Sequence, residues 1–418
     1  MQISTMWAIR NAILFRVIVA GGALAAASAV MLAPEPTPAQ SASPAQWVKA
    51  FWPAARDAGV SGGVYDRALG DFRPDPEVLQ KAQAQLEFNR RIWDYLDLTV
   101  TDYRIQAGQK LLRDNARLLS RIEARYGVDR HILVAIWGME TSYGEILENP
   151  AKLKNTIRSL ATLAYDGGDR AKFGRTQLIA ALRILQRGDV TLSGMTGSWA
   201  GAMGHTQFIP TTYQAYAVDW NGDGKRDIWT TPSDALASAA NYLEKSGWQT
   251  GKTWGYEVMV PRGFNPDLAR KSRTLAQWQA LGVRRASGDG FPRPADSASL
   301  FIPAGTKGPA FLLLQNFRVL KRYNNADAYA LAVGHLADRL KGFGPVRGTW
   351  PGSEMELDQA ARLEVQRLLT LRGFYEGKID ANLGSGSLAA IRAFQASIGV
   401  EADGQPTRRL LQQLRGGG

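Results

Sequence analysis

Apolar positions along most of the chain recur with a helical period. Between Pro76 and about Leu340 they lie three or four residues apart, as in "RDNARLLSRIEARYGV" from Arg113 to Val128 and again from Asp234 to Lys245. This spacing gathers apolar side chains on one face of a helix. The pattern weakens from Val258 to Pro309, where loops with short strands are expected. The sequence therefore predicts a mainly α-helical fold.

A break in this pattern divides the chain. The segment "KGFGPVRGTWPGSE" concentrates glycine and proline and carries little apolar periodicity, which is typical of a linker. Three short helical patterns separated by Gly-rich turns follow it and predict a small helical domain. We therefore expect a large domain over residues 43–344, a linker over residues 345–356 and a small domain over residues 357–418.

Residues 1–42 have a different pattern. Arg10 and Arg16 precede the apolar stretch "VIVAGGALAAASAVML", and small residues and prolines follow it. This is the layout of a secretory signal, best cleaved between about Ala39 and Ala42. An uncleaved signal anchor is the alternative, because the stretch is slightly long for a signal and short for a full membrane span. No later stretch looks membrane-spanning, so any membrane contact is expected only through this segment.

Composition and charge narrow the class of protein. The chain of 418 residues is 45% hydrophobic, as is ordinary for a globular protein, and it has no cysteine. This excludes disulfides and a Cys nucleophile, and export without disulfides is compatible with a bacterial periplasm. Lys and Arg outnumber Asp and Glu by 50 to 38, a net charge of +12 that favours polyanionic partners. The basic residues are scattered without a nucleic-acid motif, which favours an anionic cell-wall polymer over nucleic acid.

One carboxylic acid ends an apolar helix. In "ILVAIWGMETSYGE", apolar residues occupy every face of the helix before Glu140, so the helix is expected to be buried all round. Partial desolvation and the negative end of the helix dipole both raise the pKa of an acid in the last turn. Such a pKa suits a general acid at neutral pH. The alternative is a partly exposed Glu140 that is hydrogen-bonded to the next turn.

A second stretch combines small and polar residues. "GSWAGAMGHTQFIPTTY" has glycines that allow close backbone approach, together with the hydrogen-bonding side chains of Ser198, Gln207 and Tyr213 and the aromatic face of Trp199. Tight helix packing alone would explain the glycines. The polar residues favour a ligand-binding stretch.

The stretch "DWNGDGKRDIWTTPSD" has the start of an EF-hand loop. Asp219, Asn221 and Asp223 stand at alternate positions, and Gly224 is the sixth residue. The usual twelfth-position Glu is replaced by Thr230. Structural calcium is therefore one prediction for this loop, and an Asx-turn that leads into the next helix is the alternative.

These motifs, in this order, resemble the lytic murein transglycosylase B family over roughly Trp47 to Leu340. The resemblance implies a lysozyme-like, mainly helical fold in which Glu140 is the single catalytic carboxylate and no catalytic cofactor is needed. Glu140 would protonate the glycosidic oxygen between N-acetylmuramic acid and N-acetylglucosamine in peptidoglycan. It would then remove the proton of the C6 hydroxyl, whose oxygen closes a 1,6-anhydro ring.

The resemblance also implies roles for residues around the acid. The substrate-binding residues that match the family motif are Arg170, Ser198, Gln207, Tyr323, Asn324 and Tyr329. Asp169 stands where the family often has a further arginine, and Tyr323 and Tyr329 have an alternative as packing aromatics. For the EF-hand-like loop, the resemblance adds Asp234 as the last calcium ligand, and the backbone carbonyl of Lys225 would complete the set of Asp219, Asn221 and Asp223.

The small domain is similar to the three-helix peptidoglycan-binding domain of cell-wall proteins. Its pattern is matched by Phe374, Tyr375, Asp380, Phe394, Gln395 and Gly404, although "DANLGSGS" departs from the usual turn. Phe394 is expected in its core. A helical spacer without a ligand is the alternative.

The sequence thus predicts an exported, periplasmic, monomeric lytic transglycosylase that binds peptidoglycan glycan strands. Two other functions remain open. A hydrolytic muramidase of similar fold would leave reducing sugar ends, and a non-enzymatic cell-wall-binding protein would release nothing. The buried setting expected for Glu140 argues against the second.

Overall fold

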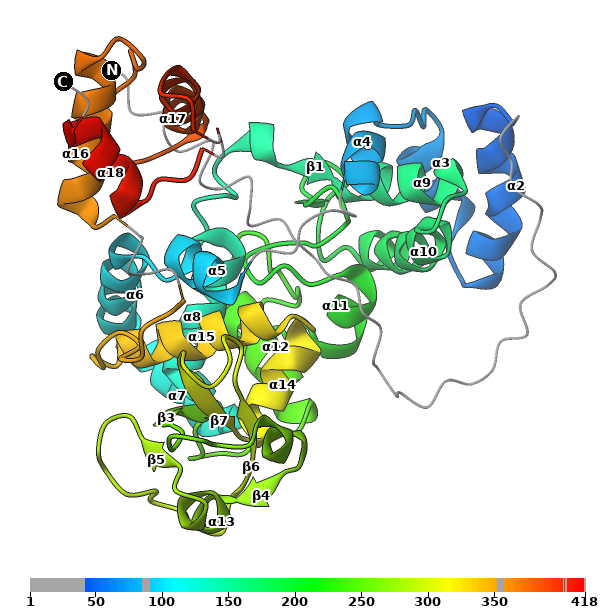
Figure 1. Cartoon of the computed structure of the whole chain (residues 1–418). Coiled ribbons are helices and arrows are strands. Elements are labelled where there is room, and N and C mark those ends of the chain that lie inside the picture. Colours follow the sequence, from blue (N-terminus) through cyan, green and yellow to red (C-terminus); the bar gives the residue numbers. More distant parts are fainter. Residues whose placement is uncertain (1–41, 85–90, 352–356, 401, 403, 417–418) are drawn as a thin grey trace.

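The computed structural model describes residues 42–84, 91–351, 357–400, 402 and 404–416. The predicted signal segment lies outside these residues, apart from Ala42. The chain forms a mainly helical body, a small antiparallel sheet and a separate three-helix bundle (Figure 1). No helix among the described residues is long and apolar enough to cross a membrane.

The central body surrounds one buried helix. This helix, α8 (Arg130–Thr141), packs closely against α15 (Asp327–Leu340) and also contacts α6 (Asp102–Asp114), α7 (Ala116–Tyr126) and α12 (Pro232–Lys245). Every residue from Ile132 to Met139 is buried, which confirms the all-round burial predicted from the sequence. The same core includes α5 (Ile92–Thr99) and α14 (Gln315–Tyr323).

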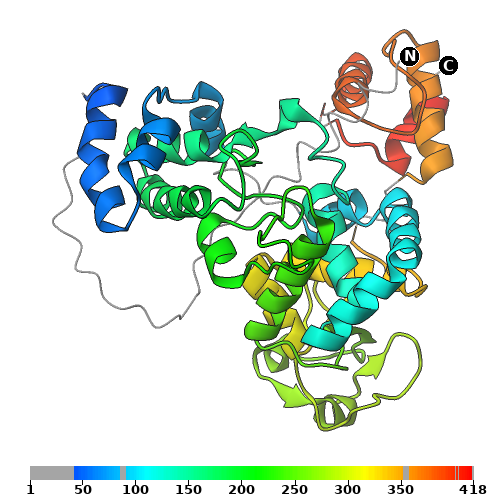
Figure 2. The same cartoon turned by 180° about the vertical axis from the view of Figure 1, so that it is seen from behind.

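A second helical lobe lies beside this body, shown in blue and green in Figures 1 and 2. Its core joins the N-terminal helices to the pair formed by α9 and α10. The helices of this lobe are α2 (Pro44–Asp57), α3 (Gly62–Leu69), α4 (Pro76–Ala84), α9 (Thr156–Asp166), α10 (Ala171–Arg187) and α11 (Pro210–Tyr216). The segments before α9 and after α10 pair in a two-stranded antiparallel sheet of β1 (Lys154–Asn155) and β2 (Thr196–Gly197).

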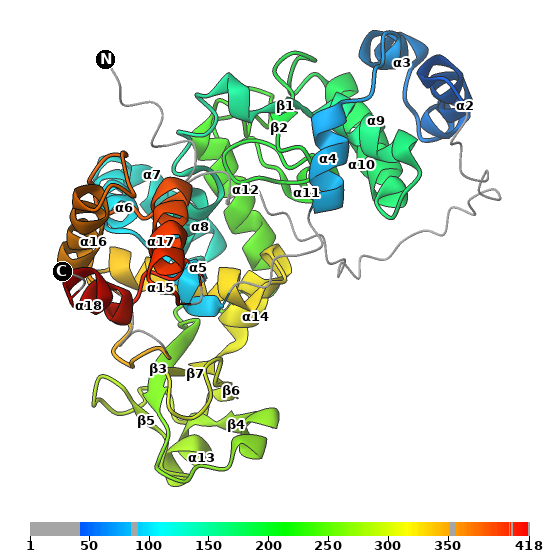
Figure 3. The same cartoon turned by 45° about the horizontal axis from the view of Figure 1, so that its top comes forward.

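The region with weak apolar periodicity forms the largest sheet among the described residues. Its five antiparallel strands follow the order β4-β6-β7-β3-β5 and share a separate core with α13 (Leu275–Ala280). The sheet projects from the central body at the bottom of Figures 1 and 3. The strands are β3 (Gly255–Met259), β4 (Arg273–Thr274), β5 (Arg284–Arg285), β6 (Ser297–Phe301) and β7 (Ala310–Leu313).

The C-terminal bundle consists of α16 (Gln359–Leu371), α17 (Ser385–Ser397) and α18 (Arg408–Gly416) around its own apolar core. Phe394 is buried in that core, as predicted. The amide of Gln366, which is fully buried, binds the turn before α17 by accepting from the backbone N–H groups of Asp380 and Ala381. The helices and this buried amide make the bundle a folded unit.

The expected linker begins with an ordered segment. The carboxylate of Glu257 accepts hydrogen bonds from the backbone N–H groups of Arg347 and Gly348, at 2.9 Å and 2.7 Å. The ring of Trp350 stacks on Trp93, with centroids 5.5 Å apart. The chain therefore stays packed on the large domain past position 344, as far as Trp350.

Candidate active site

Glu140 lies in the last turn of α8, where the buried helix reaches the surface. Its side chain is only partly accessible to solvent. Burial raises the pKa of Glu140 from 4.5 to about 7, and a hydrogen bond from Tyr329 acts in the opposite direction. The carboxyl group can therefore both give and take a proton near neutral pH.

The hydroxyl of Tyr329 is the group that faces this acid. It donates a hydrogen bond of 2.5 Å to Oε1 of Glu140 from the first turn of α15. Tyr329 is 5% exposed, and burial together with the nearby Glu140 raises its pKa well above 10. Tyr329 therefore packs in the core, as the alternative of a packing aromatic predicted. It also contacts the candidate catalytic group.

The turn after α8 holds the acid in place through an unusual backbone. Ser142, Tyr143 and Gly144 all have positive φ, at 49°, 63° and 97°. The ring of Tyr143 folds back over Gly138, where an added Cβ would lie 2.6 Å from the ring. Such conformations persist only where surrounding contacts enforce them, and they concentrate at functional sites.

The loop from β2 to α11 approaches the same helix end. Thr141 donates a hydrogen bond of 2.8 Å from its hydroxyl to the backbone carbonyl of His205. The next residue of the loop is Thr206. Its backbone carbonyl accepts a hydrogen bond of 2.6 Å from the hydroxyl of Tyr323, which lies at the end of α14. The loop is thus fixed both to the end of α8 that carries Glu140 and to the end of α14.

Ser198 and Gln207 are both nearly buried in this loop, at 1% and 8% exposure. The Ser198 hydroxyl accepts from the backbone N–H of Ala202 at 3.1 Å, and the Gln207 amide donates to the carbonyl of Gly204 at 2.8 Å. Gln207 has a φ of 52°. In this structure their side chains shape the loop, and their predicted contacts with substrate remain predictions.

The other predicted substrate-binding residues lie on different elements of the fold, and of these Tyr323 is electrostatically coupled to the acid. Tyr323 is close enough for the charge of Glu140 to raise its pKa, although burial is the larger cause. Asn324 accepts from the backbone N–H of Ala326 at 3.2 Å and so shapes the turn between α14 and α15. Arg170 belongs to the second lobe, at the start of α10, where its guanidinium lies 5.3 Å from the ring centre of Trp199.

The EF-hand-like loop forms a series of tight turns. Both carboxylate oxygens of Asp219 accept backbone N–H groups, from Gly222 at 2.7 Å and Gly224 at 2.8 Å. Asp223 accepts from the backbone N–H of Lys225 at 2.9 Å. The described residues contain no group of three or more His, Asp or Glu side chains placed to hold a metal ion. The hydrogen bonds of Asp219 and Asp223 are those of Asx turns, and the calcium ligands stay a prediction.

Asp234 nevertheless faces this loop from the start of α12. Its carboxylate accepts from the backbone N–H groups of Trp220 and Asp227, at 3.1 Å and 3.0 Å. Burial raises the pKa of Asp234, and the negative charge of Asp219 adds to the shift. A cation bound between the two side chains would offset the repulsion that Asp219 exerts on ionised Asp234. The charge arrangement is compatible with calcium, although the ligands are not gathered around one point.

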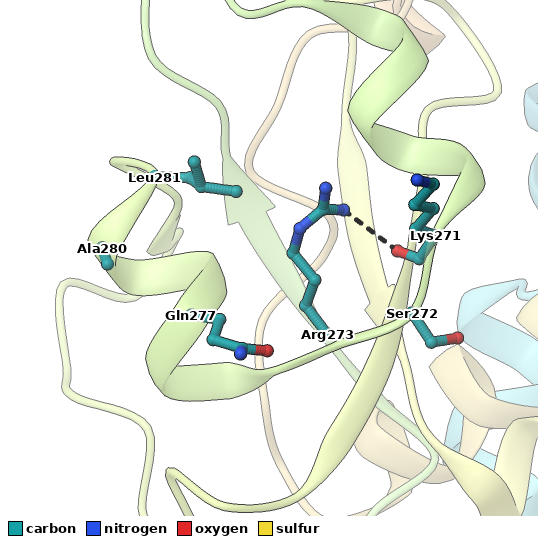
Figure 4. A pocket seen from close by; sticks show the side chains of 6 residues that line it. All are labelled: Lys271, Ser272, Arg273, Gln277, Ala280 and Leu281. Atoms are coloured by element: carbon teal, nitrogen blue, oxygen red, sulfur yellow. Dashed lines mark hydrogen bonds between the residues drawn. The ribbon is translucent and has the colours of Figure 1, made fainter.

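A surface hollow on the small sheet is not part of this site. It is lined by Lys271, Ser272, Arg273, Gln277, Ala280 and Leu281, around β4 and α13 (Figure 4). Arg273 donates to the carbonyl of Lys271 beside it. The candidate active site is instead defined by Glu140 and the elements that surround it.

Thr141 and His205 both lie in the motifs quoted from the sequence, but neither was predicted to have a role. Trp137 lies one helical turn before the acid, and its indole Nε1 donates a hydrogen bond of 3.1 Å to Nδ1 of His205. The sequence signal for such a role is a histidine inside a Gly-rich stretch, because its polar ring needs a hydrogen-bond partner when it is buried.

By its fold, the protein is a lysozyme-like helical protein with a three-helix C-terminal module. The profile described as transglycosylase SLT domain matches residues 43–338, and that of a peptidoglycan binding domain matches residues 358–414. The chain belongs to the transglycosylase SLT family, as the resemblance in its motifs predicted.

Among curated proteins, the chain is similar to the membrane-bound lytic murein transglycosylase B of Escherichia coli, with 32% identity over 240 residues. That alignment covers 57% of this chain and 64% of the relative, somewhat less than two thirds of its length.

The chain is also similar to solved structures of lytic transglycosylases. SltB3 from Pseudomonas aeruginosa, in complex with NAG-anhNAM-pentapeptide, is 50% identical, with a TM-score of 0.71 over 89% of this chain and 99% of that one. The E. coli lytic transglycosylase Slt35, in complex with calcium, is 27% identical, with a TM-score of 0.60 over 70% of this chain and 92% of that one.

Proposed function

We propose that the protein is an exported, periplasmic lytic transglycosylase that cleaves the bond between N-acetylmuramic acid and N-acetylglucosamine without adding water. The observation that carries this proposal is the state of Glu140, a partly buried acid with a pKa of about 7. Among the described residues, the hydrogen-bond partner of its carboxyl group is the hydroxyl of Tyr329 rather than a second carboxyl group. Hydrolytic glycosidases ordinarily act through a pair of carboxylates, whereas a single acid suffices when no water is added.

In the proposed reaction, Glu140 is the single group that carries the proton. Protonated Glu140 donates its proton to the glycosidic oxygen, and the bond from that oxygen to C1 of the muramic acid breaks. The Tyr329 hydroxyl, which donates to Oε1, stabilises the carboxylate that is left. This carboxylate then takes the proton of the C6 hydroxyl as O6 bonds to C1. Glu140 ends protonated, and no water is consumed.

Mass spectrometry of the released fragments tests this proposal. Incubating the purified protein with peptidoglycan sacculi should release muropeptides that end in 1,6-anhydro-N-acetylmuramic acid. A hydrolytic muramidase would release products heavier by one water, with reducing ends. Sacculi that bind the protein but release no fragments would point to a non-enzymatic wall-binding protein.

The C-terminal module is proposed to hold the enzyme on insoluble peptidoglycan. Its support is the family match over residues 358–414 and its separate apolar core. A chain that ends after Pro351 keeps the packing of Trp350 on Trp93, so it is a better test than one that ends at Gly344. The shortened enzyme should cleave soluble glycan fragments at the full-length rate and act several-fold more slowly on sacculi, because a tethered module raises the local substrate concentration. Loss of activity on soluble fragments would place the module in the active site.

Calcium is proposed as a structural ion of the loop from Asp219 to Asp234, with Asn221 and Asp223 as further ligands and the carbonyl of Lys225 completing the set. The support is the oxygen-only donor set, the mutual repulsion of Asp219 and Asp234, and the similarity of the chain to the E. coli protein solved with calcium. No step of the reaction involves this ion.

A further inference from the structure

The contacts between α8 and the 204–208 loop form a clamp beside the acid. We define this clamp as Trp137, Thr141 and His205. Trp137 and Thr141 lie on α8, three residues before and one residue after Glu140, and both bind the same residue of the loop. We infer that His205 is a positioning residue, which holds the Gln207 loop in register with Glu140 through its ring and its backbone carbonyl.

The hydrogen bonds fix the state of the His205 ring. An indole N–H can only donate, so Nδ1 of His205 must accept and cannot carry a proton. In the neutral ring the proton is therefore on Nε2. A protonated ring would place two N–H donors against each other and break this bond.

The surroundings favour the neutral ring. Burial lowers the pKa of His205 to about 4, and the charge of Asp227 opposes this shift only in part. The ring meets Trp137 edge-on, at an interplanar angle of 85°, and Gly144 leaves room for it, because an added Cβ there would lie 2.7 Å from the ring. The backbone N–H of His205 donates to the carbonyl of Ile228, which ties the clamp to the chain that leads into α12.

The second half of the clamp is the Thr141 hydroxyl. It donates to the carbonyl of His205 and accepts from the backbone N–H of Gly144, so it joins the loop to the strained turn after α8. Thr206, the next residue of the loop, accepts the hydroxyl of Tyr323. A shift of His205 would therefore move both Gln207 and the Tyr323 partner relative to Glu140. A misplacement of active-site groups by about 1 Å can lower the rate of the chemical step by about 100-fold.

The inference rests on the proposed function, so the wild-type enzyme must first be shown to form 1,6-anhydro ends. Trp137→Phe removes the indole donor and keeps an aromatic ring. We expect kcat to fall about tenfold while KM stays within about twofold, the size of a lost buried hydrogen bond. Trp278→Phe is the matched control, because its indole donates to the carbonyl of Ala298 in the separate core of the small sheet. It should lower the melting temperature and leave kcat unchanged.

Substitutions of His205 give a second, independent test of its positioning role. His205→Asn keeps an acceptor near the place of Nδ1 and should retain most of kcat, whereas His205→Leu should match Trp137→Phe. Wild-type kcat should also fall in acid with a midpoint near pH 4, because protonation of His205 opens the clamp, and this fall should be absent in His205→Asn. Equal loss of kcat in Trp137→Phe and Trp278→Phe, or an unchanged acid midpoint in His205→Asn, would overturn the inference.

Nitrogen NMR of the wild-type protein separates the clamp from the proposed function. It should show a His205 ring with its proton on Nε2 at pH 7 and a protected indole N–H on Trp137. A proton on Nδ1 would refute the clamp even in an active enzyme. If the wild type shows this tautomer but forms no anhydro product, the proposed function fails and the clamp stands as a structural contact only, without a positioning role.

Discussion

Glu140 and Asp223 are two acids placed in opposite environments. Glu140 ends a buried helix, and burial raises its pKa to about 7. Asp223 is in an exposed turn, where hydrogen bonds from the side chain of Asn221 and the backbone N–H of Lys225 lower its pKa. The first can exchange a proton near neutral pH, and the second stays charged. Desolvation thus makes a proton carrier of one acid, whereas hydrogen bonding without burial keeps the other acid as an anion suited to a cation.

The largest expected effect is that of Glu140→Gln. The amide keeps the shape of the side chain but can neither donate the proton nor take it back, so release of anhydro-muropeptides should fall by at least about 100-fold. Assays of soluble fragments and circular dichroism of the variant measure activity and folding together. Asp223→Asn, the same chemical change in the exposed acid, should keep close to full activity. Wild-type activity in a folded Glu140→Gln protein would remove the catalytic assignment.

A smaller effect is expected when the partner of the acid is removed. Tyr329→Phe deletes the hydrogen bond that lowers the pKa of Glu140, so that pKa should rise above about 7. Activity requires protonated Glu140 in the first step, and the alkaline fall in kcat/KM should move to higher pH. The carboxylate formed in that step loses its donor, and kcat should drop about tenfold.

Tyr323→Phe is the control for that experiment. Its hydroxyl donates to the carbonyl of Thr206 and makes no hydrogen bond to the acid in this structure. The alkaline fall should therefore stay near its wild-type position in Tyr323→Phe. Equal shifts in both variants would mean that Tyr329 does not tune the acid.

The two acids should also have opposite effects on stability as pH changes. The pKa of Glu140 is raised on folding, so its ionisation costs stability as pH rises from 4.5 to about 7. Glu140→Gln should therefore raise the free energy of unfolding at pH 8, by up to about 3 kcal/mol, and change it little at pH 4. Asp223 has a lowered pKa and adds stability above its unfolded pKa, so Asp223→Asn should be slightly destabilising at pH 8. Urea unfolding at the two pH values measures both, and a destabilised Glu140→Gln protein at pH 8 would contradict the environment described for this acid.

The smallest expected effect concerns calcium. An ion that binds only the folded state stabilises it by mass action, so millimolar calcium should raise the melting temperature by a few degrees. Asp223→Ala should remove this response, whereas Asp71→Ala, at an exposed acid of another loop, should keep it. A wild-type melting curve that is the same in calcium and in chelator would leave the loop as a set of Asx turns.

Much of the fold was predictable because apolar periodicity reports burial directly. The all-round apolar run before Glu140 gave a buried helix, and the helix expected from Asp234 to Lys245 is α12. The sheet was harder to predict, since its strands are short and two of them, β4 and β5, have only two residues each. Such strands carry no alternation of their own and depend on pairing with distant segments.

The site was predictable in part. The motifs placed an acid at a helix end, but nothing in a linear pattern could show that Tyr329, in a helix 189 residues later, donates to it. The same limit applies to the clamp of Trp137, Thr141 and His205, which joins a helix to a loop. Trp350 likewise stands in a Gly- and Pro-rich stretch that resembles a free linker. The order of that segment comes from tertiary contacts, namely its stacking on Trp93 and the hydrogen bonds of Arg347 and Gly348 to Glu257.

The central claim is that one acid moves one proton out and back while no water enters the product. The most direct measurement is digestion of sacculi in ¹⁸O-labelled water by the wild-type protein and by Glu140→Gln, followed by mass spectrometry of the released sugars. The wild type should release 1,6-anhydro ends that contain no ¹⁸O, and the variant should release almost none. Reducing ends that carry ¹⁸O, or anhydro ends released equally by the variant, would contradict the account.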